Sequence, residues 1–419
     1  MLKSILNAFK SPELRKKIAF TFALLAIYRL GTFVPVPGVD AKGIADRING
    51  QGAANVLQFL NLFSGGALTR FSVFALGIMP YITASIVIQL MTVVIPKLEA
   101  LQKEGEAGYA KITQYTRYLT VALAFLQSLA YVMFFKKQGA LENLGFGRLY
   151  LVIISLTAGT VLVMWLGELV TQRGIGNGIS LMIFASIVAG IPTGIRRWWE
   201  LEPVSKIIIA IMAVAVVVGV VFVNEGQRRI PIQYAKRVVG RRMTQGGTTY
   251  MPLRVNMAGV IPVIFAASIV ILPSLFSTLL GGNTGFFADL GRLLGTNSWF
   301  YIVFQAVLII LFTYFYTAVQ FNPVDQADNL KKYGGFVPGV RPGRPTAVYL
   351  DRVMTRLTLP GAIYLAGIAS LPNVVFKYMP EVNFTFAGTS LLIVVGVAID
   401  TMRQLEAQLM QRNYEGFLK

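Results

Sequence analysis

Few side chains in this sequence could carry out catalysis. The 419 residues include no histidine and no cysteine, which removes the usual general base near neutral pH, thiol nucleophiles, disulfides and most zinc ligand sets. The metalloprotease pattern H-E-x-x-H, the phosphate-binding pattern G-x-x-x-x-G-K-[ST] and the hydrolase pattern G-x-S-x-G do not occur either. We therefore expect no enzymatic activity and no metal site, so the energy for any transport must come from outside the chain.

The charged residues are mostly basic. Lys and Arg number 38 and Asp and Glu 19, which gives a net charge of +19 in a chain that is 55% apolar and only 14% charged. An ordinary soluble domain carries roughly 25% charged residues. The basic excess must therefore lie in loops, where anionic lipid headgroups, acidic protein or RNA could bind it.

Apolar segments long enough to cross a bilayer, roughly 17 to 25 residues each, recur along the whole chain. They lie near residues 18–36, 73–95, 113–135, 149–171, 177–195, 205–223, 257–280, 299–321, 353–376 and 384–402. An even number of spans places both ends on one side of the membrane, and most of the Lys and Arg residues lie in the loops of that side. The positive-inside rule then predicts cytoplasmic termini, and the fold class is an all-α polytopic membrane protein.

Two pairs of matching motifs indicate an internal duplication. Segments two and seven share the pattern G-[IV]-x-P-x-I-x-A, which begins at Gly77 and at Gly259. Segments five and ten share G-x-S-L-x-I, which begins at Gly178 and at Gly388. Inverted repeats of transport proteins place the working site where corresponding helices are interrupted. The alternative is that Gly and Pro are simply common in membrane helices.

This duplication divides the chain into an N-terminal half, residues 1–200, and a C-terminal half, residues 201–419. Each motif carries an isoleucine in register, and these are Ile82, Ile264, Ile183 and Ile393. Ile78 lies one helical turn before Ile82, and Ile269 is a looser candidate. Such a ring could open around an unspecific chain and exclude water and ions when closed. For any one of these isoleucines the ordinary alternative is a packing or lipid-facing residue.

A Gly-rich stretch at residues 60–72 precedes segment two and is too short to span the membrane. The predicted topology places it on the outer side. A short half-helix hinged at Gly65 and Gly66 could fold into an external funnel as a re-entrant stopper. A loop helix lying at the membrane interface is an equally good interpretation.

A secondary transporter of small solutes is the main alternative function, because inverted repeats with broken helices occur there too. It requires buried charges at mid-membrane to bind substrate or coupling ions. Arg29 lies toward the outer part of segment one, while Glu168 and Asp400 lie toward cytoplasmic ends. We interpret Arg29 as a structural ion pair or a snorkelling residue, so the transporter function is disfavoured.

Several long motifs resemble the bacterial SecY family, nearly from end to end and in the right order. They are residues 60–66 (LNLFSGG), 74–82 (FALGIMPYI), 174–178 (GIGNG), 256–262 (NMAGVIP) and 335–343 (GFVPGVRPG). The resemblance implies ten transmembrane helices in two inverted five-helix halves that form an hourglass pore. The implied function is that of the central protein-conducting channel of the Sec translocon, which passes unfolded secretory polypeptides across the bacterial inner membrane and releases transmembrane segments laterally into lipid.

The resemblance also implies which residues form the site. The family's pore ring matches Ile78, Ile82, Ile183, Ile264, Ile269 and Ile393. Its plug matches Leu60, Asn61, Leu62, Phe63, Ser64, Gly65, Gly66, Ala67, Leu68, Thr69, Arg70, Phe71 and Ser72. The lateral gate should lie between segments two and three on one side and seven and eight on the other, with polar positions at Thr83, Gln127 and Asn256. Helix packing without a gating role is the alternative for these three residues.

Partners follow from the same resemblance. Two long cytoplasmic loops, residues 224–255 and 322–350, are similar to the family's docking platform for the ribosome and the motor ATPase SecA, with Arg241, Arg242 and Arg341 as docking residues. Plain positive-inside topology is the alternative explanation of these basic loops. Further expected partners are the small membrane subunits SecE and SecG, signal peptides and nascent chains, anionic lipids, and accessory Sec membrane proteins with an insertase. No cofactor is expected. Arg344 departs from the acidic or polar residue common in related sequences.

Overall fold

The computed structural model describes residues 11–37, 39, 61, 63–137, 145–234, 238–239, 242–243, 247–280, 298–378 and 389–415. Long helices fall on all ten predicted segments. They are α2 (Pro12–Gly31), α5 (Met79–Val94), α7 (Glu106–Lys137), α8 (Phe146–Arg173), α9 (Gly178–Glu200), α10 (Pro203–Glu225), α11 (Ile261–Leu280), α13 (Trp299–Gln320), α15 (Arg344–Tyr378) and α16 (Thr389–Glu415). The predicted all-α polytopic membrane fold is confirmed.

The described helices differ in whether their length and hydropathy are sufficient for a membrane span. By length and composition six of them qualify alone, and α5 with the short α6 (Pro96–Lys103) makes a seventh that is bent by 99°. The bend falls at Pro96, the first residue of α6, since proline cannot donate the backbone hydrogen bond that would continue α5.

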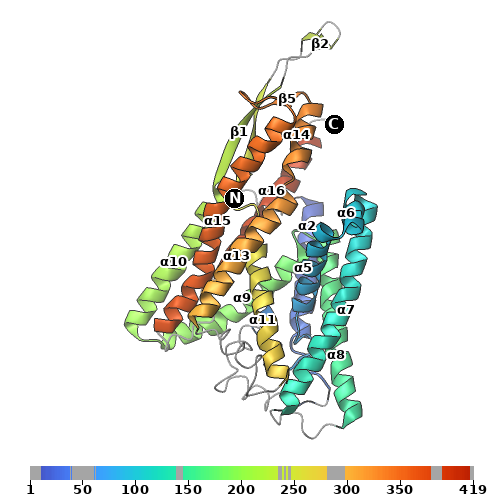
Figure 1. The fold of residues 1–419 in the computed structure, drawn as a ribbon. Helices are drawn as coiled ribbons and strands as arrows, with labels where there is room; N and C mark the ends of the chain where they lie inside the picture. Colours follow the sequence, from blue (N-terminus) through green and yellow to red (C-terminus); the bar gives the residue numbers. More distant parts are fainter. Residues whose placement is uncertain are drawn as a thin grey trace.

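The helices pack as two groups that touch along one seam (Figure 1). In the first group α5 contacts α7, α7 contacts α8, and α2 contacts α8 and α9. In the second, α13 contacts α11 and α15, and α16 contacts α10 and α15. Between the groups, α11 contacts both α5 and α7, and α9 contacts α16. The helices of the first group come from residues 12–200 and those of the second from residues 203–415.

Strands form a small sheet that the hydropathy pattern did not anticipate. β1 (Gln227–Tyr234) pairs antiparallel with β4 (Thr248–Arg254) and with β5 (Gly335–Phe336), while β2 (Val238–Val239) pairs with β3 (Arg242–Met243). Ile230 and Leu253 of this sheet are buried with Leu350 and Met354 of α15. The apolar positions are too few for a hydropathy signal, yet they suffice to fix the sheet on the helix end.

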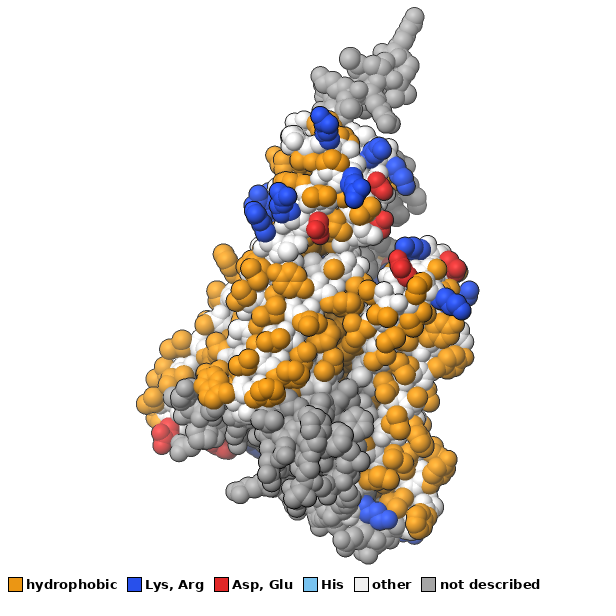
Figure 2. Space-filling view, viewed as in Figure 1, with side chains coloured by type: hydrophobic (Ala, Val, Ile, Leu, Met, Phe, Trp, Pro, Cys, Tyr) orange, Lys and Arg blue, Asp and Glu red, His pale blue; other side chains and the backbone are white. Residues whose placement is uncertain are grey.

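Charge and apolar surface are separated along the molecule. The sheet and α14 (Pro323–Lys332) extend beyond the helices at one end (Figure 1), and Figure 2 shows Lys and Arg side chains gathered at that end and around α6. The flanks of the helices are covered by apolar side chains. α10 is an example, because only 17% of its most apolar window is buried in the protein. Such a flank suits lipid and a basic end suits water.

Candidate functional site

The two copies of the G-[IV]-x-P-x-I-x-A motif adopt the same local structure. Gly77 has φ +56° and Gly259 has φ +62°, and each stands two residues before a helix start, at Met79 of α5 and Ile261 of α11. Positive φ is a conformation that residues with a Cβ rarely adopt. In both copies, therefore, a glycine turns the backbone just before a new helix begins. This shared local structure supports the proposal of an internal duplication.

The six predicted ring isoleucines lie inside the protein. Ile78, Ile82, Ile183, Ile264 and Ile393 are 1%, 4%, 1%, 5% and 1% exposed. All five belong to one apolar cluster, and the half-buried Ile269 packs against it. The cluster also contains many other core residues, tyrosines among them, and it draws the isoleucines from α5, α9, α11 and α16 and from the turn before α5, so helices of both halves contribute to it.

A cavity of about 400 Å³ lies beside this cluster. Ile264 and Val397 line it on the apolar side, and Asp400, Arg254 and Arg403 are among its charged residues. Arg254 ends β4, so the cavity reaches toward the basic end of the molecule. An extended chain entering from that end would meet polar groups first and the isoleucine cluster next.

The plug candidate is folded by its own hydrogen bonds. Asn61 Oδ1 accepts from the Thr69 backbone N–H at 3.1 Å, and the Asn61 carbonyl accepts from Gly66 N–H at 2.9 Å. Residues 64–70 are turns, so the expected half-helix does not extend beyond the glycine hinge. Gly65 and Gly66 have φ +65° and +84°, which bends the chain away from a helical path. Leu60 and Leu62 lie outside the described residues.

The plug candidate is packed into the protein core. Phe63, Ser64, Ala67, Leu68, Phe71 and Ser72 are buried, Gly66 and Thr69 are partly exposed, and Arg70 is exposed. The ring of Phe71 meets that of Phe135 of α7 edge-on at 5.3 Å. The Phe71 carbonyl accepts from Val36 N–H at 3.0 Å, and the neighbouring Ser72 forms a β-bridge with Pro35. These contacts hold the segment between α2, α7 and the start of α5.

The three candidate gate residues do not bond to one another. Thr83 is buried in α5 and donates to the Met79 carbonyl of its own helix at 3.0 Å. Gln127 of α7 is half-buried. Asn256 is buried before α11 and donates to Asn224 Oδ1 at 2.9 Å and to the Gly259 carbonyl at 3.2 Å. Asn256 is thus tied to its own half of the chain.

The candidate docking loop is a rigid frame with an exposed arginine. Gly339 and Gly343 have φ +83° and +100°, and the Arg341 carbonyl between them accepts from Thr346 Oγ1 at 2.8 Å. Val337 anchors the loop in the cluster under the sheet, while Arg341 is exposed. Arg241 lies outside the described residues, and the backbone of Arg242 lies in β3.

Two contacts were not evident in the sequence. Arg117 of α7 donates to both carboxylate oxygens of Glu168 of α8, with Nε at 2.9 Å from Oε1. Arg29 of α2 donates to the carbonyl of Gly65 in the plug candidate, and within the described residues no carboxylate lies within 4.0 Å of its guanidinium. No sequence pattern links these residues, which stand 51 and 36 positions apart.

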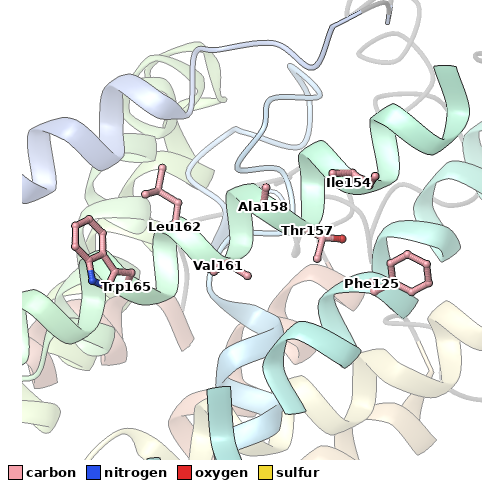
Figure 3. Close-up of a pocket in the computed structure, with 7 residues that line it drawn as sticks. All are labelled: Phe125, Ile154, Thr157, Ala158, Val161, Leu162 and Trp165. Carbon is pink, nitrogen blue, oxygen red and sulfur yellow. The ribbon is translucent and has the colours of Figure 1, made fainter. Parts of the chain in front are cut away.

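A further groove lies on the outside of the bundle and is separate from the ring. It is lined by Phe125 of α7 and by Ile154, Thr157, Ala158, Val161, Leu162 and Trp165 of α8, with a volume of about 500 Å³ (Figure 3). Phe125 and Trp165 are 39% and 55% exposed. An open apolar groove of this kind suits lipid or a membrane helix and offers no chemistry for a polar substrate.

A family model and several known proteins match this chain along its length. A family model described as SecY matches residues 72–402. The protein translocase subunit SecY of Corynebacterium glutamicum is 49% identical over 440 residues, covering 100% of both chains. Those of Streptomyces galbus and Mycobacterium tuberculosis are 49% and 48% identical over 442 residues, again covering 100% of both chains.

Solved structures have the same fold at low sequence identity. One described as a protein-conducting channel matches with a TM-score of 0.65 and 19% identity, covering 93% of this chain and 91% of that one. Another, of a SecY protein studied for its plug domain, has a TM-score of 0.62 at the same identity and coverage. The channel of a canine ribosome-channel complex from the endoplasmic reticulum has a TM-score of 0.61, also at 19% identity with 93% and 91% coverage.

Proposed function

Because this chain belongs to the SecY family of protein translocase subunits, it is a multi-pass membrane protein of protein translocation, and we propose that its isoleucine cluster is the translocation pore. The pore passes unfolded secretory polypeptides across the bacterial inner membrane and releases transmembrane segments sideways into lipid. The observation that carries the proposal is the meeting of isoleucines from α5, α9, α11 and α16 in one buried cluster.

The proposed seal has two layers. Aliphatic side chains form no fixed hydrogen bonds, so an extended peptide can push them apart without leaving polar groups unsatisfied. When no peptide is present, the same side chains exclude water. The plug, residues 60–72, packs against helices of the ring, since a Cβ on Gly65 would lie 3.2 Å from Cα of Ser186, one turn beyond Ile183. Opening then requires the plug to leave and the ring to widen.

Lateral release uses the seam where α11 contacts α5 and α7. The seam is the boundary of the two helix groups, so it can part without breaking either group. Thr83, Gln127 and Asn256 lie on or beside these helices and set the stability of the closed seam. A polar contact between membrane helices contributes on the order of 0.5 to 2 kcal/mol, but the Thr83 hydroxyl bonds within its own helix and contributes less than this.

Docking takes place at the basic end that carries the sheet. Arg341 there is exposed on a glycine-framed loop, and a guanidinium binds phosphate or carboxylate through two parallel hydrogen bonds. We assign Arg241, Arg242 and Arg341 to contacts with the ribosome and with the motor ATPase SecA. A ribosome-channel complex among the similar structures supports the ribosome as a partner.

Membrane partners and placement follow from the surface. The small subunits SecE and SecG cover part of the exposed apolar flanks, and anionic lipids bind the basic end. Accessory Sec membrane proteins and an insertase receive released segments. The basic end faces the cytoplasm together with both termini, in agreement with the positive-inside rule.

Reconstitution tests the function directly. Proteoliposomes that contain this chain with SecE and SecG, supplied with SecA and ATP, should make a secretory precursor resistant to external protease. Liposomes with the small subunits alone provide the control. Failure to protect the precursor, with SecA binding intact, would contradict the channel function.

A further inference from the structure

Arg29 is an unusual residue in this structure because it is a charged side chain within the membrane-spanning α2. Its hydrogen-bond acceptors among the described residues are the Gly65 carbonyl and Thr32 Oγ1, the latter at 3.4 Å. Its guanidinium also lies 5.1 Å from the centre of the Phe33 ring. No carboxylate of the described chain pairs with it within 4.0 Å. Among the residues that the structure describes, the plug carbonyl is therefore its closest hydrogen-bond acceptor.

The position of Gly65 makes this contact selective for the seated plug. Gly65 adopts φ +65°, and a Cβ built on it would lie 3.1 Å from Arg29 Nη1 and 3.2 Å from Ser186 Cα of α9. The glycine backbone is therefore enclosed between α2 and α9. Tyr28, next to Arg29, bonds to Ser186 Oγ at 2.7 Å and ties these two helices together at the same level.

A second contact links the same region of α2 to the plug. Two guanidinium groups approach the Phe33 ring, that of Arg29 at 5.1 Å and that of the plug residue Arg70 at 4.0 Å from its centre. Cations over an aromatic face are attracted to it. Withdrawal of the plug would remove the Gly65 carbonyl and the Arg70 contact together, and would leave the Arg29 charge in a half-buried site with the more distant Thr32 Oγ1, at 3.4 Å, as its remaining acceptor among the described residues.

We propose that Arg29 is a positioning residue that latches the plug in the closed pore through the Gly65 carbonyl. This proposal rests on the proposed function, in which residues 60–72 close the pore. A hydrogen bond from a charged donor is stronger than one between neutral groups. The latch therefore sets a threshold that an entering polypeptide must overcome before the plug leaves.

A cysteine-labelling experiment tests the latch. The chain contains no cysteine, so Ala67→Cys, at a plug position that is 0% exposed, introduces a single thiol. Its labelling rate by a membrane-impermeant maleimide added to the outer face of cells reports how often the plug is displaced. Adding Arg29→Met should raise this rate at least about ten-fold, the lower end of the range expected for losing a hydrogen bond to a charged group. Arg29→Lys, which keeps the charge but lacks the guanidinium fork, should give an intermediate rate.

Two controls separate a latch from general loosening. Arg148→Met removes an exposed positive charge at the start of α8 and should leave the labelling rate unchanged. Ser128→Cys places a thiol at a 0% exposed site that faces Thr157 of α8, and its labelling should not respond to Arg29→Met. Equal rates at Ala67→Cys with and without Arg29→Met, or an equal rise at Ser128→Cys, would overturn the latch.

The same thiol distinguishes failure of the latch from failure of the proposed function. In the chain with Arg29 intact, an arrested secretory polypeptide should raise the labelling of Ala67→Cys, because the plug must leave the pore. If the polypeptide raises labelling and Arg29→Met does not, only the latch is wrong. If the polypeptide has no effect, residues 60–72 do not act as a plug and both proposals fall.

Discussion

A polar substitution within the ring is the perturbation with the clearest expected magnitude. Ile264 is 5% exposed, lies in the first turn of α11 and borders both the isoleucine cluster and the cavity of about 400 Å³. Ile264→Asn removes apolar burial worth about 1.5–3 kcal/mol. In the closed, dry ring the new amide is buried without a partner, which costs about 1–3 kcal/mol. In the hydrated ring that second cost disappears.

The equilibrium between the dry and the hydrated pore should therefore shift by about 2 kcal/mol or more, which is roughly thirty-fold in the population of the conducting state. The assay is the resting conductance of purified channels in a planar bilayer. Exchanging Ile82, Ile183, Ile264 and Ile393 together should raise the leak further, until the hydrated state dominates. The ring variants should differ in conductance and share the folded structure of the parent.

Ile309→Asn is the matched control. Ile309 is 0% exposed in α13 and belongs to the same apolar cluster, yet it is not one of the predicted ring residues. It should lower thermal stability by a similar amount without opening a conductive path. A resting conductance of the Ile264→Asn channel no higher than that of the Ile309→Asn channel would refute the reasoning, because general loosening would then explain both.

Four other changes have defined outcomes. Arg341→Glu should reduce SecA-driven export several-fold in inverted vesicles while the helical CD signal stays unchanged. Arg344→Glu, the same change of charge at a neighbouring site, tests whether charge alone is responsible. An equal loss of export in both variants would contradict a special role of Arg341. Glu168→Gln breaks the ion pair between Arg117 and Glu168, whose own side chain is only 10% exposed. It should destabilise the packing of α7 against α8 by about 1–3 kcal/mol, seen as a lower Tm in detergent. An unchanged Tm would show that the ion pair is energetically neutral. Gly77→Ala and Gly259→Ala should each lower the free energy of unfolding by about 1–2 kcal/mol, because alanine disfavours the positive φ of these sites. Gly367→Ala, at a helical site with open space around it, should leave the Tm in detergent unchanged or raise it. Equal Tm values for all three variants would contradict the conformational argument. Thr83→Val should change the export of weak-signal precursors less than two-fold, since its hydroxyl bonds only to its own helix backbone; a large change would show that the hydroxyl acts across the seam.

The sequence predicts this fold well where one residue type repeats and poorly where single contacts decide. Hydropathy located all ten long helices, because burial in lipid selects apolar side chains over some twenty consecutive positions. It did not predict the sheet, which rests on single buried residues such as Ile230 and Leu253. The shared glycine motifs of segments two and seven correspond to a positive φ at Gly77 and Gly259, two residues before the starts of α5 and α11, because positive φ favours glycine.

The sequence did not predict side-chain contacts between residues that are far apart along the chain. The bond from Arg29 to Gly65 uses a backbone carbonyl, which every residue has, so its acceptor leaves no trace in the residue type. The partner of Asn256 is Asn224, in the same half, whereas the expected gate role pointed across the seam. The plug path also depends on Phe71, a non-glycine residue with φ +45°, a conformation that its type disfavours.

The central claim, that a polypeptide passes through the isoleucine ring, is tested most directly by disulfide crosslinking to an arrested secretory chain. The natural absence of cysteine allows one thiol at Ile264→Cys and one in the arrested chain. A crosslink should form at Ile264→Cys and should be absent at Val218→Cys, a position of α10 that is 61% exposed on the apolar flank. Crosslinks at the Val218 site with none at the Ile264 site would contradict the account.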